Sequence, residues 1–184
     1  MQHCGTQSLE TKRLILRPFV MEDAPFMFNN WASNPEVAKF LTWTHHTELR
    51  ESIEVLMDWT FNYANKNFYT WAIVLKELGE PIGSIAVNYI DENIKSVEIG
   101  YCIGQNWWYQ GIAAEALQEV IKFFFTKTDV NRIEALHDPE NPNSGKVMQK
   151  CGMTYEGTLR DGDYGNLGIR DTCLYSILKR EYKV

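Results

Sequence analysis

The sequence predicts one α+β domain. Residues 96–125 carry the clearest signal, because an alternating apolar pattern typical of a strand is followed by apolar residues at helical spacing. Two further apolar runs, 68–76 and 81–90, flank a short polar turn and predict a hairpin. The chain of 184 residues suits a single domain over 1–184, and it shows no linker, repeat or low-complexity tract.

The N-terminal part predicts one strand and two helices. An apolar run ended by Pro18 predicts a strand over 14–17, and acidic residues followed by a proline predict a helix over 23–31. A longer helix is expected over 47–63, with Thr47 as its N-cap. Its expected buried stripe consists of Ile53, Leu56, Met57, Phe61 and Ala64.

The C-terminal part predicts three strands and a helix. These elements are a strand at 132–137, a helix at 141–150 and strands at 154–159 and 172–178. Gly152 suits the left-handed residue that follows a helix end. Between the last two strands, residues 161–168 are rich in glycine and predict a mobile loop.

Composition and charge exclude several classes of protein. A net charge of −6 argues against a nucleic-acid-binding protein, which would usually show a basic face. The four cysteines are far apart and the histidines form no ligand pattern, so no metal site is expected. No apolar run of about 18 residues occurs, so no membrane association is expected either. These features predict a reduced, cytoplasmic protein.

The turn at 109–114 is the first candidate binding site. It opens a helix with small residues around Gly111 and with no acidic side chain in the first few helical positions. Free amides at a helix start attract anions, and a glycine lets a phosphate approach the backbone. A tight turn without any ligand is the alternative interpretation.

The whole string GYCIGQNWWYQGIAAEAL resembles the Gln/Arg-x-x-Gly-x-Gly/Ala signature of the GNAT acyltransferases. Gly111 and Ala113 stand in its last two specified positions. The string is most similar to the RimJ/RimL-like branch of ribosomal-protein N-acetyltransferases, where a tryptophan, here Trp108, replaces the usual Arg or Gln and a Glu-Ala pair follows. Tyr109 and Ala114 depart from the residues common there. Residues 10–17 also resemble the opening Glu-Thr-x-Arg-Leu-x-Leu-Arg of that family.

This resemblance implies a fold and a cofactor. The GNAT fold is a mixed, mostly antiparallel seven-stranded sheet with a splayed central strand, flanked by about four helices. Members transfer an acetyl group from acetyl-CoA to a primary amine and need no metal. By resemblance, backbone groups of Tyr101, Cys102 and Ile103 would bind the pantetheine arm and thioester carbonyl. The pyrophosphate would be held by Gln110, Gly111, Ile112, Ala113 and Ala114.

Three residues are candidates for the chemistry. Glu98 lies on the strand face opposite Tyr101 and is a candidate base, or alternatively an ion-paired carboxylate at a strand edge. By resemblance, Asn141 would contact the cofactor arm and Ser144 would protonate the leaving thiolate, although a serine that opens a helix is usually only an N-cap. Asp163 falls where RimL-like proteins carry an acid proposed to activate the amine, and a solvated turn residue is its alternative.

The acceptor side is the least determined part of the prediction. Trp43, His45 and Trp71 are expected there, and the acceptor is either a protein N-terminal amine or a small-molecule amine. The family also implies a homodimer. The rival hypothesis is an acyl-CoA sensor or an inactive binding module that keeps the cofactor groove. The third hypothesis is a protein with an apolar pocket that does not bind CoA.

Overall fold

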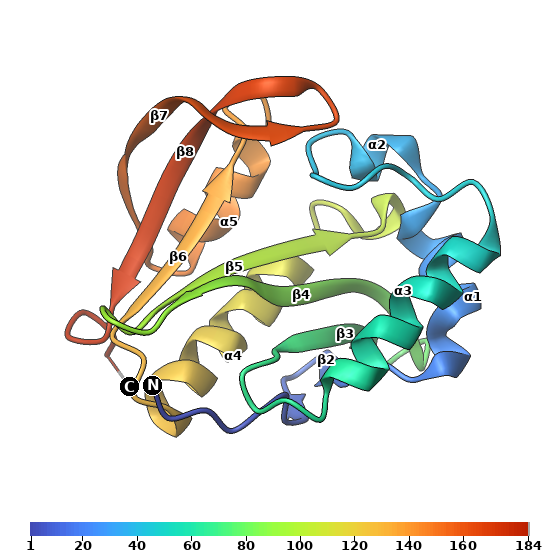
Figure 1. The fold of residues 1–184 in the computed structure, drawn as a ribbon, viewed down its shortest axis with the longest axis horizontal. Helices are drawn as coiled ribbons and strands as arrows, with labels where there is room; N and C mark the ends of the chain where they lie inside the picture. Colours follow the sequence, from blue (N-terminus) through green and yellow to red (C-terminus); the bar gives the residue numbers. More distant parts are fainter. Residues whose placement is uncertain (184) are drawn as a thin grey trace.

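A computed structural model describes residues 1–183. They form an eight-stranded sheet in the order β1-β2-β3-β4-β5-β6-β8-β7, antiparallel except between β5 and β6 (Figure 1). The expected α+β, mostly antiparallel sheet is confirmed, with eight strands rather than seven because the short β1 pairs with β2. The strands are β1 (Leu9–Glu10), β2 (Leu14–Arg17), β3 (Thr70–Leu75), β4 (Glu80–Asp91), β5 (Ser96–Ile103), β6 (Arg132–His137), β7 (Thr154–Gly165) and β8 (Gly168–Leu178).

The described residues form five α-helices, rather than the expected four or so. They are α1 (Ala24–Met27), α2 (Pro35–Ala38), α3 (Leu49–Asn62), α4 (Ile112–Lys127) and α5 (Pro142–Lys150). The helix expected over 23–31 is composite, since a 3₁₀ turn at Met21–Asp23 precedes α1 and a π turn at Phe28–Ala32 follows it. Figure 1 shows α4 across one face of the sheet and α3 on the other.

Aromatic side chains fill the core beneath α4. Trp71 on β3 is fully buried, and its ring meets Phe123 of α4 edge-on at 5.6 Å. Its indole N–H donates to the Gln7 carbonyl (2.7 Å), so its one polar group is satisfied inside the protein. The prediction that Trp71 lines the acceptor side is therefore wrong, because its side chain belongs to the core.

The buried face of α3 differs from the expected stripe. Ser52 and Leu56 are buried, whereas Met57 is 59% and Phe61 is 80% exposed. Trp59 is half-buried on the same side, and its ring lies 5.0 Å from that of Phe19. Apolar residues occur on both sides of this helix, so periodicity alone could not fix its rotation. The predicted cap is also displaced by one residue: Glu48, not Thr47, is the N-cap.

The central strands separate after a short paired stretch. β5 and β6 pair only from Ser96–Glu98 to Arg132–Glu134, three register pairs in all. Beyond Glu98 the two strands diverge, as Figure 1 shows. The expected splayed central strand is confirmed, and the gap that it opens faces the N-terminal end of α5.

The predicted mobile loop at 161–168 is mostly strand. β7 continues to Gly165 and β8 begins at Gly168, so only a tight turn joins them. The tip of this hairpin contacts the 38–43 loop on the opposite half of the molecule. Asn166 N–H donates to the Leu41 carbonyl (3.1 Å), and its side-chain amide donates to the carbonyls of Ala38 (2.8 Å) and Trp43 (2.6 Å).

Candidate active site

The open edge of β5 carries unpaired backbone groups. On the other edge β4 is paired, and Gly104 N–H donates to the Ile82 carbonyl at 2.8 Å. Backbone groups of successive residues point to alternate edges of a strand. Those of Cys102 therefore face β4, while those of Tyr101 and Ile103 face the gap. The prediction that the Cys102 backbone contacts the donor arm is wrong for this reason.

Trp108 occupies the Ile103 carbonyl, so fewer backbone groups of Ile103 are free to bind a ligand in the gap. Its indole N–H donates to the Ile103 carbonyl (2.7 Å), which ties the turn before α4 to the end of β5. Tyr101 is thus the residue that presents both a donor and an acceptor to the gap.

The start of α4 has the geometry expected of an anion site. Gly111 is the N-cap, in the left-handed region at φ 73°, and Tyr109 two residues earlier is also left-handed at φ 62°. Ile112 and Ala114 are almost fully buried, whereas Gln110 is exposed and Gly111 and Ala113 are partly exposed. The amides of the first helical turn have no partner within the helix, and those at Gly111 and Ala113 belong to the residues that solvent reaches.

Two cations lie close to Gly111. A Cβ atom at this glycine would be 3.5 Å from Lys150 Nζ and 3.8 Å from Arg13 Nη2. Positive side chains and the positive end of the helix dipole therefore act on the same spot. Neither side chain was among the predicted site residues.

Ser144 lies inside the first turn of α5 rather than at its cap. Asn141 is the N-cap residue, and its side chain makes no capping bond. The Ser144 hydroxyl is 3.0 Å from the Tyr101 hydroxyl, which also donates to the Ser144 carbonyl at 3.0 Å. Burial raises the pKa of Tyr101, so this phenol stays protonated at neutral pH. The Tyr101 side chain was missed, although strand alternation placed it on this face.

Glu98 lies at the vertex of the gap, on the sheet face opposite Tyr101. It is half-buried, and Asn88 Nδ2 donates to its Oε1 at 3.4 Å. Burial raises the pKa of Glu98; the Asn88 bond lowers it, and the nearby carboxylates of Glu134 and Asp163 raise it again, for a net increase. The structure thus brings Glu98 near Asp163, two residues that the sequence separated by 65 positions.

Two further residues of this cluster were missed. Glu134 is the register partner of Glu98 on β6. Asn88 occupies a bulge of β4, and its amide lies where a side chain at position 100 would be: a Cβ on Gly100 would be 2.5 Å from Asn88 Nδ2. The glycine in the middle of a strand was the available sequence signal.

A hollow lies between the 38–43 loop and the β7–β8 hairpin, where the acceptor is expected. It is lined by Asp163 and Arg170 from the hairpin and by Phe40 and Thr42 from the loop. Trp43 packs against the buried His46 at 5.8 Å, while His45 is exposed. Trp43 lies on this loop and His45 follows it, but within residues 1–183 no hydrogen bond or ion pair joins either of them to Asp163.

Residues 1–183 hold no cluster of three or more His, Cys, Asp or Glu placed to bind a metal ion. None of their helices is long and apolar enough to cross a membrane.

Comparisons with known proteins agree with this geometry. Residues 13–154 match the family model described as the acetyltransferase (GNAT) domain. The chain is 37% identical to "Uncharacterized N-acetyltransferase p20" of Bacillus licheniformis, over 96% of this chain and 98% of that one. It is 26% identical to the ribosomal-protein-serine acetyltransferase of Escherichia coli, over 74% and 75% of the two chains.

A solved structure extends the comparison to the fold. The microcin C7 self-immunity acetyltransferase MccE, in complex with acetyl-CoA and AMP, superposes with a TM-score of 0.83 at 21% identity, over 91% of this chain and 93% of that one. The resemblance to ribosomal-protein acetyltransferases is confirmed by the Escherichia coli relative. The chain therefore belongs to the acetyltransferase (GNAT) family, whose acyl donor is acetyl-CoA.

Proposed function

We propose that this enzyme transfers the acetyl group of acetyl-CoA to a primary amine by direct attack. One observation carries the proposal. Where β5 and β6 part, a carboxylate with a raised pKa lies on one face of the sheet and a hydroxyl pair lies on the other. A thioester in the gap would meet a base from the side of Glu98 and an acid from the side of Ser144.

Each residue has a defined task in this reaction. Glu98 takes a proton from the incoming ammonium, directly or through water, and the neutral amine forms the new C–N bond to the thioester carbonyl. The Tyr101 backbone donates to the developing oxyanion. As the C–S bond breaks, the Ser144 hydroxyl donates its proton to the sulfur. The attacking nitrogen loses its second proton to water, which returns a proton to Ser144, so the products are the amide, CoA and the proton first taken by Glu98.

The acceptor is an amine carried on a chain that fits beneath the hairpin tip. Support comes from the carboxylates of Glu98, Glu134 and Asp163, which favour a cation, and from the Asn166 contacts that close the hairpin onto the 38–43 loop. An extended N-terminal peptide suits such an enclosed approach. The relative named ribosomal-protein-serine acetyltransferase adds support for a protein as the acceptor.

The test measures CoA release from acetyl-CoA in the presence of free N-terminal peptides. We expect release that depends on the peptide, and no release from the same peptides after N-terminal acetylation. Polyamines and lysine side chains on N-terminally blocked peptides form the comparison set. If blocked peptides with lysines react as fast as free N-termini, the proposed acceptor is wrong. If no amine releases CoA although CoA binds, an acyl-CoA sensor replaces the enzyme.

A further inference from the structure

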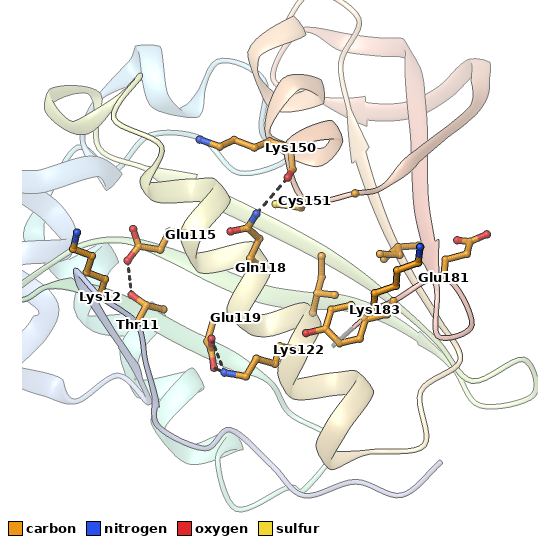
Figure 2. Close-up of a pocket in the computed structure, with 14 residues that line it drawn as sticks. Thr11, Lys12, Glu115, Gln118, Glu119, Lys122, Lys150, Cys151, Glu181 and Lys183 are labelled. Carbon is orange, nitrogen blue, oxygen red and sulfur yellow. Dashed lines mark hydrogen bonds and ion pairs between the residues drawn. The ribbon is translucent and has the colours of Figure 1, made fainter.

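The N-terminal segment contacts the beginning of α4 through a single carboxylate. Thr11 Oγ1 donates to Glu115 Oε1 (2.6 Å), and Arg13 N–H donates to the same oxygen at 2.9 Å. Arg13 Nε donates to Oε2 at 2.7 Å. Figure 2 shows Glu115 on the first turn of α4, directed toward Thr11. No step proposed above uses this contact, although it joins residues that lie more than a hundred positions apart.

The Glu115 carboxylate is ionised and only partly accessible. Burial raises its pKa, but the hydrogen bonds from Thr11 and from the Arg13 backbone and side chain outweigh this and lower it overall. Its side chain is 20% exposed. A charge-assisted pair in such a position is stronger and better oriented than one on the open surface.

The other nitrogens of Arg13 reach the turn before α4. Nη1 donates to the Gln110 carbonyl at 3.0 Å, so the guanidinium bridges Glu115 and the turn. Nη2 donates no hydrogen bond within residues 1–183, and it lies 3.8 Å from the position of a Cβ on Gly111. The planar guanidinium is thus fixed by two of its nitrogens while the third is directed at the helix start.

Lys150 approaches the same point from α5. Its Nζ lies 3.5 Å from the Gly111 Cβ position and forms no ion pair within the described residues. Thr11, Glu115, Gln118 and Lys150 line one end of a hollow of about 680 Å³ along α4 (Figure 2). Two cations with free N–H groups beside helix amides suit a group with two negative charges, such as a diphosphate.

We infer that Arg13 binds the diphosphate of the acyl donor, and that Glu115 is the positioning residue that orients it. The inference rests on the proposed function and deepens it. Glu115 fixes Nε, Gln110 fixes Nη1, and Nη2 is left for a phosphate oxygen. The arginine also holds the turn that contains two left-handed residues, Tyr109 and Gly111.

The experiment compares CoA with pantetheine, which lacks the diphosphate and the nucleotide. Binding of CoA is measured by calorimetry and binding of pantetheine by NMR titration. We expect Arg13→Ala to weaken CoA binding by about 10- to 100-fold, the range for a hydrogen bond to a charged group, and to leave pantetheine binding unchanged. Arg13→Lys keeps the charge but cannot bridge Glu115 and Gln110, so an intermediate loss is expected.

Glu115→Gln isolates the positioning role. Glutamine retains an acceptor for Thr11 and the Arg13 amide but turns an amino group toward Arg13 Nε. We expect about a 3- to 10-fold weaker CoA affinity and again no effect on pantetheine. Arg50→Ala is the matched control, because Arg50 is 81% exposed on α3 and, among residues 1–183, forms an ion pair only with Glu54.

The outcomes separate this inference from the function on which it rests. Equal weakening of CoA and pantetheine by Arg13→Ala would assign the arginine a merely structural role and overturn the inference. An unchanged, wild-type affinity for CoA in both Arg13→Ala and Arg13→Lys would also overturn the inference. A wild-type protein that does not bind CoA would refute the proposed function, and this inference with it. Dephospho-CoA bound as tightly as CoA by wild type, and weakened equally by Arg13→Ala, would place the contact at the diphosphate rather than the 3′-phosphate.

Discussion

Glu98 is held partly out of water where β5 and β6 separate, and its surroundings control its charge. Desolvation raises its pKa, the Asn88 hydrogen bond opposes this, and Glu134 and Asp163 add to the increase. Arg132 pairs with Glu134, so its positive charge offsets part of the negative charge that acts on Glu98. A base works only when ionised, so activity should be present above the raised pKa of Glu98 and be lost as the pH falls through it.

Glu98→Gln should therefore lower kcat/KM by about 10²- to 10⁴-fold, the usual contribution of a general base. It should also remove the acidic limb of the pH profile, which in wild type lies above the ordinary glutamate pKa of about 4.3. The profile is measured from pH 5 to 9 with saturating acetyl-CoA. A variant that keeps the wild-type rate and limb would show that another group is the base.

The same substitution has an opposite effect on stability. The pKa of Glu98 is raised by folding, so its charge costs stability: the cost is absent below the unfolded pKa and grows as the pH rises toward the folded pKa. Glu98→Gln should thus melt at a higher temperature than wild type at pH 8 and at nearly the same temperature at pH 4. Thermal denaturation at the two pH values measures this. A variant less stable than wild type at pH 8 would contradict the assigned cost.

Ser144 is the residue for which the structure changed the interpretation most. It lies in the first turn of α5, with its hydroxyl 3.0 Å from that of Tyr101, so its side chain is not an N-cap. Ser144→Ala should lower kcat by about 10- to 100-fold if the hydroxyl protonates the thiolate, within the range of acid catalysis when water can partly substitute. CoA affinity should stay within about twofold. Stopped-assay kinetics and calorimetry give the two values, and a loss in affinity alone would deny the acid role.

At the scale of elements, the β7–β8 hairpin joins two halves of the molecule that the central sheet holds together weakly. Its tip relies on Asn166, whose side-chain amide donates to two carbonyls of the 38–43 loop. Asn166→Ala removes both bonds, at about 1 kcal/mol each. We expect a several-fold higher KM for the acceptor, an unchanged KM for acetyl-CoA, and faster hydrogen exchange at residues 163–168. Unchanged exchange there would show that the contact does not hold the hairpin.

The sequence predicted most elements because their periodicity was clear. The strand at 96–103 and the helix that follows it were confirmed, since their apolar residues recur on one face. The rotation of α3 was not predictable, because Met57 and Phe61 are apolar yet exposed. The long hairpin was also missed: Asp163 and Arg170 are cross-strand partners whose pairing local composition does not reveal.

Across the molecule, the same distinction between local patterns and long-range contacts separates the parts of the candidate site that could be predicted from those that could not. The glycine N-cap at Gly111 and the helix that it opens follow from a local string, so this helix start could be predicted. The clusters of Glu98 with Glu134, and of Arg13 with Glu115, depend on contacts between distant segments. Trp71 shows the opposite error. It was expected on the acceptor side, but its side chain lies in the core, because strand alternation directs it under α4.

The gap between β5 and β6 also predicts how the donor should affect the whole molecule. Only three register pairs join these strands, so a ligand that contacts the Tyr101 edge, the start of α4 and α5 would add contacts between the two halves of the sheet. CoA at about 100 times its Kd should stabilise the fold by about 2.7 kcal/mol. For a chain of this size that corresponds to a Tm increase of about 5–10 °C.

Hydrogen exchange should slow on both β5 and β6 when CoA binds, while exchange on α3, on the opposite face of the sheet, stays unchanged. Stabilisation confined to α4 would mean that CoA binds outside the gap, and no stabilisation would contradict acetyl-CoA as the donor.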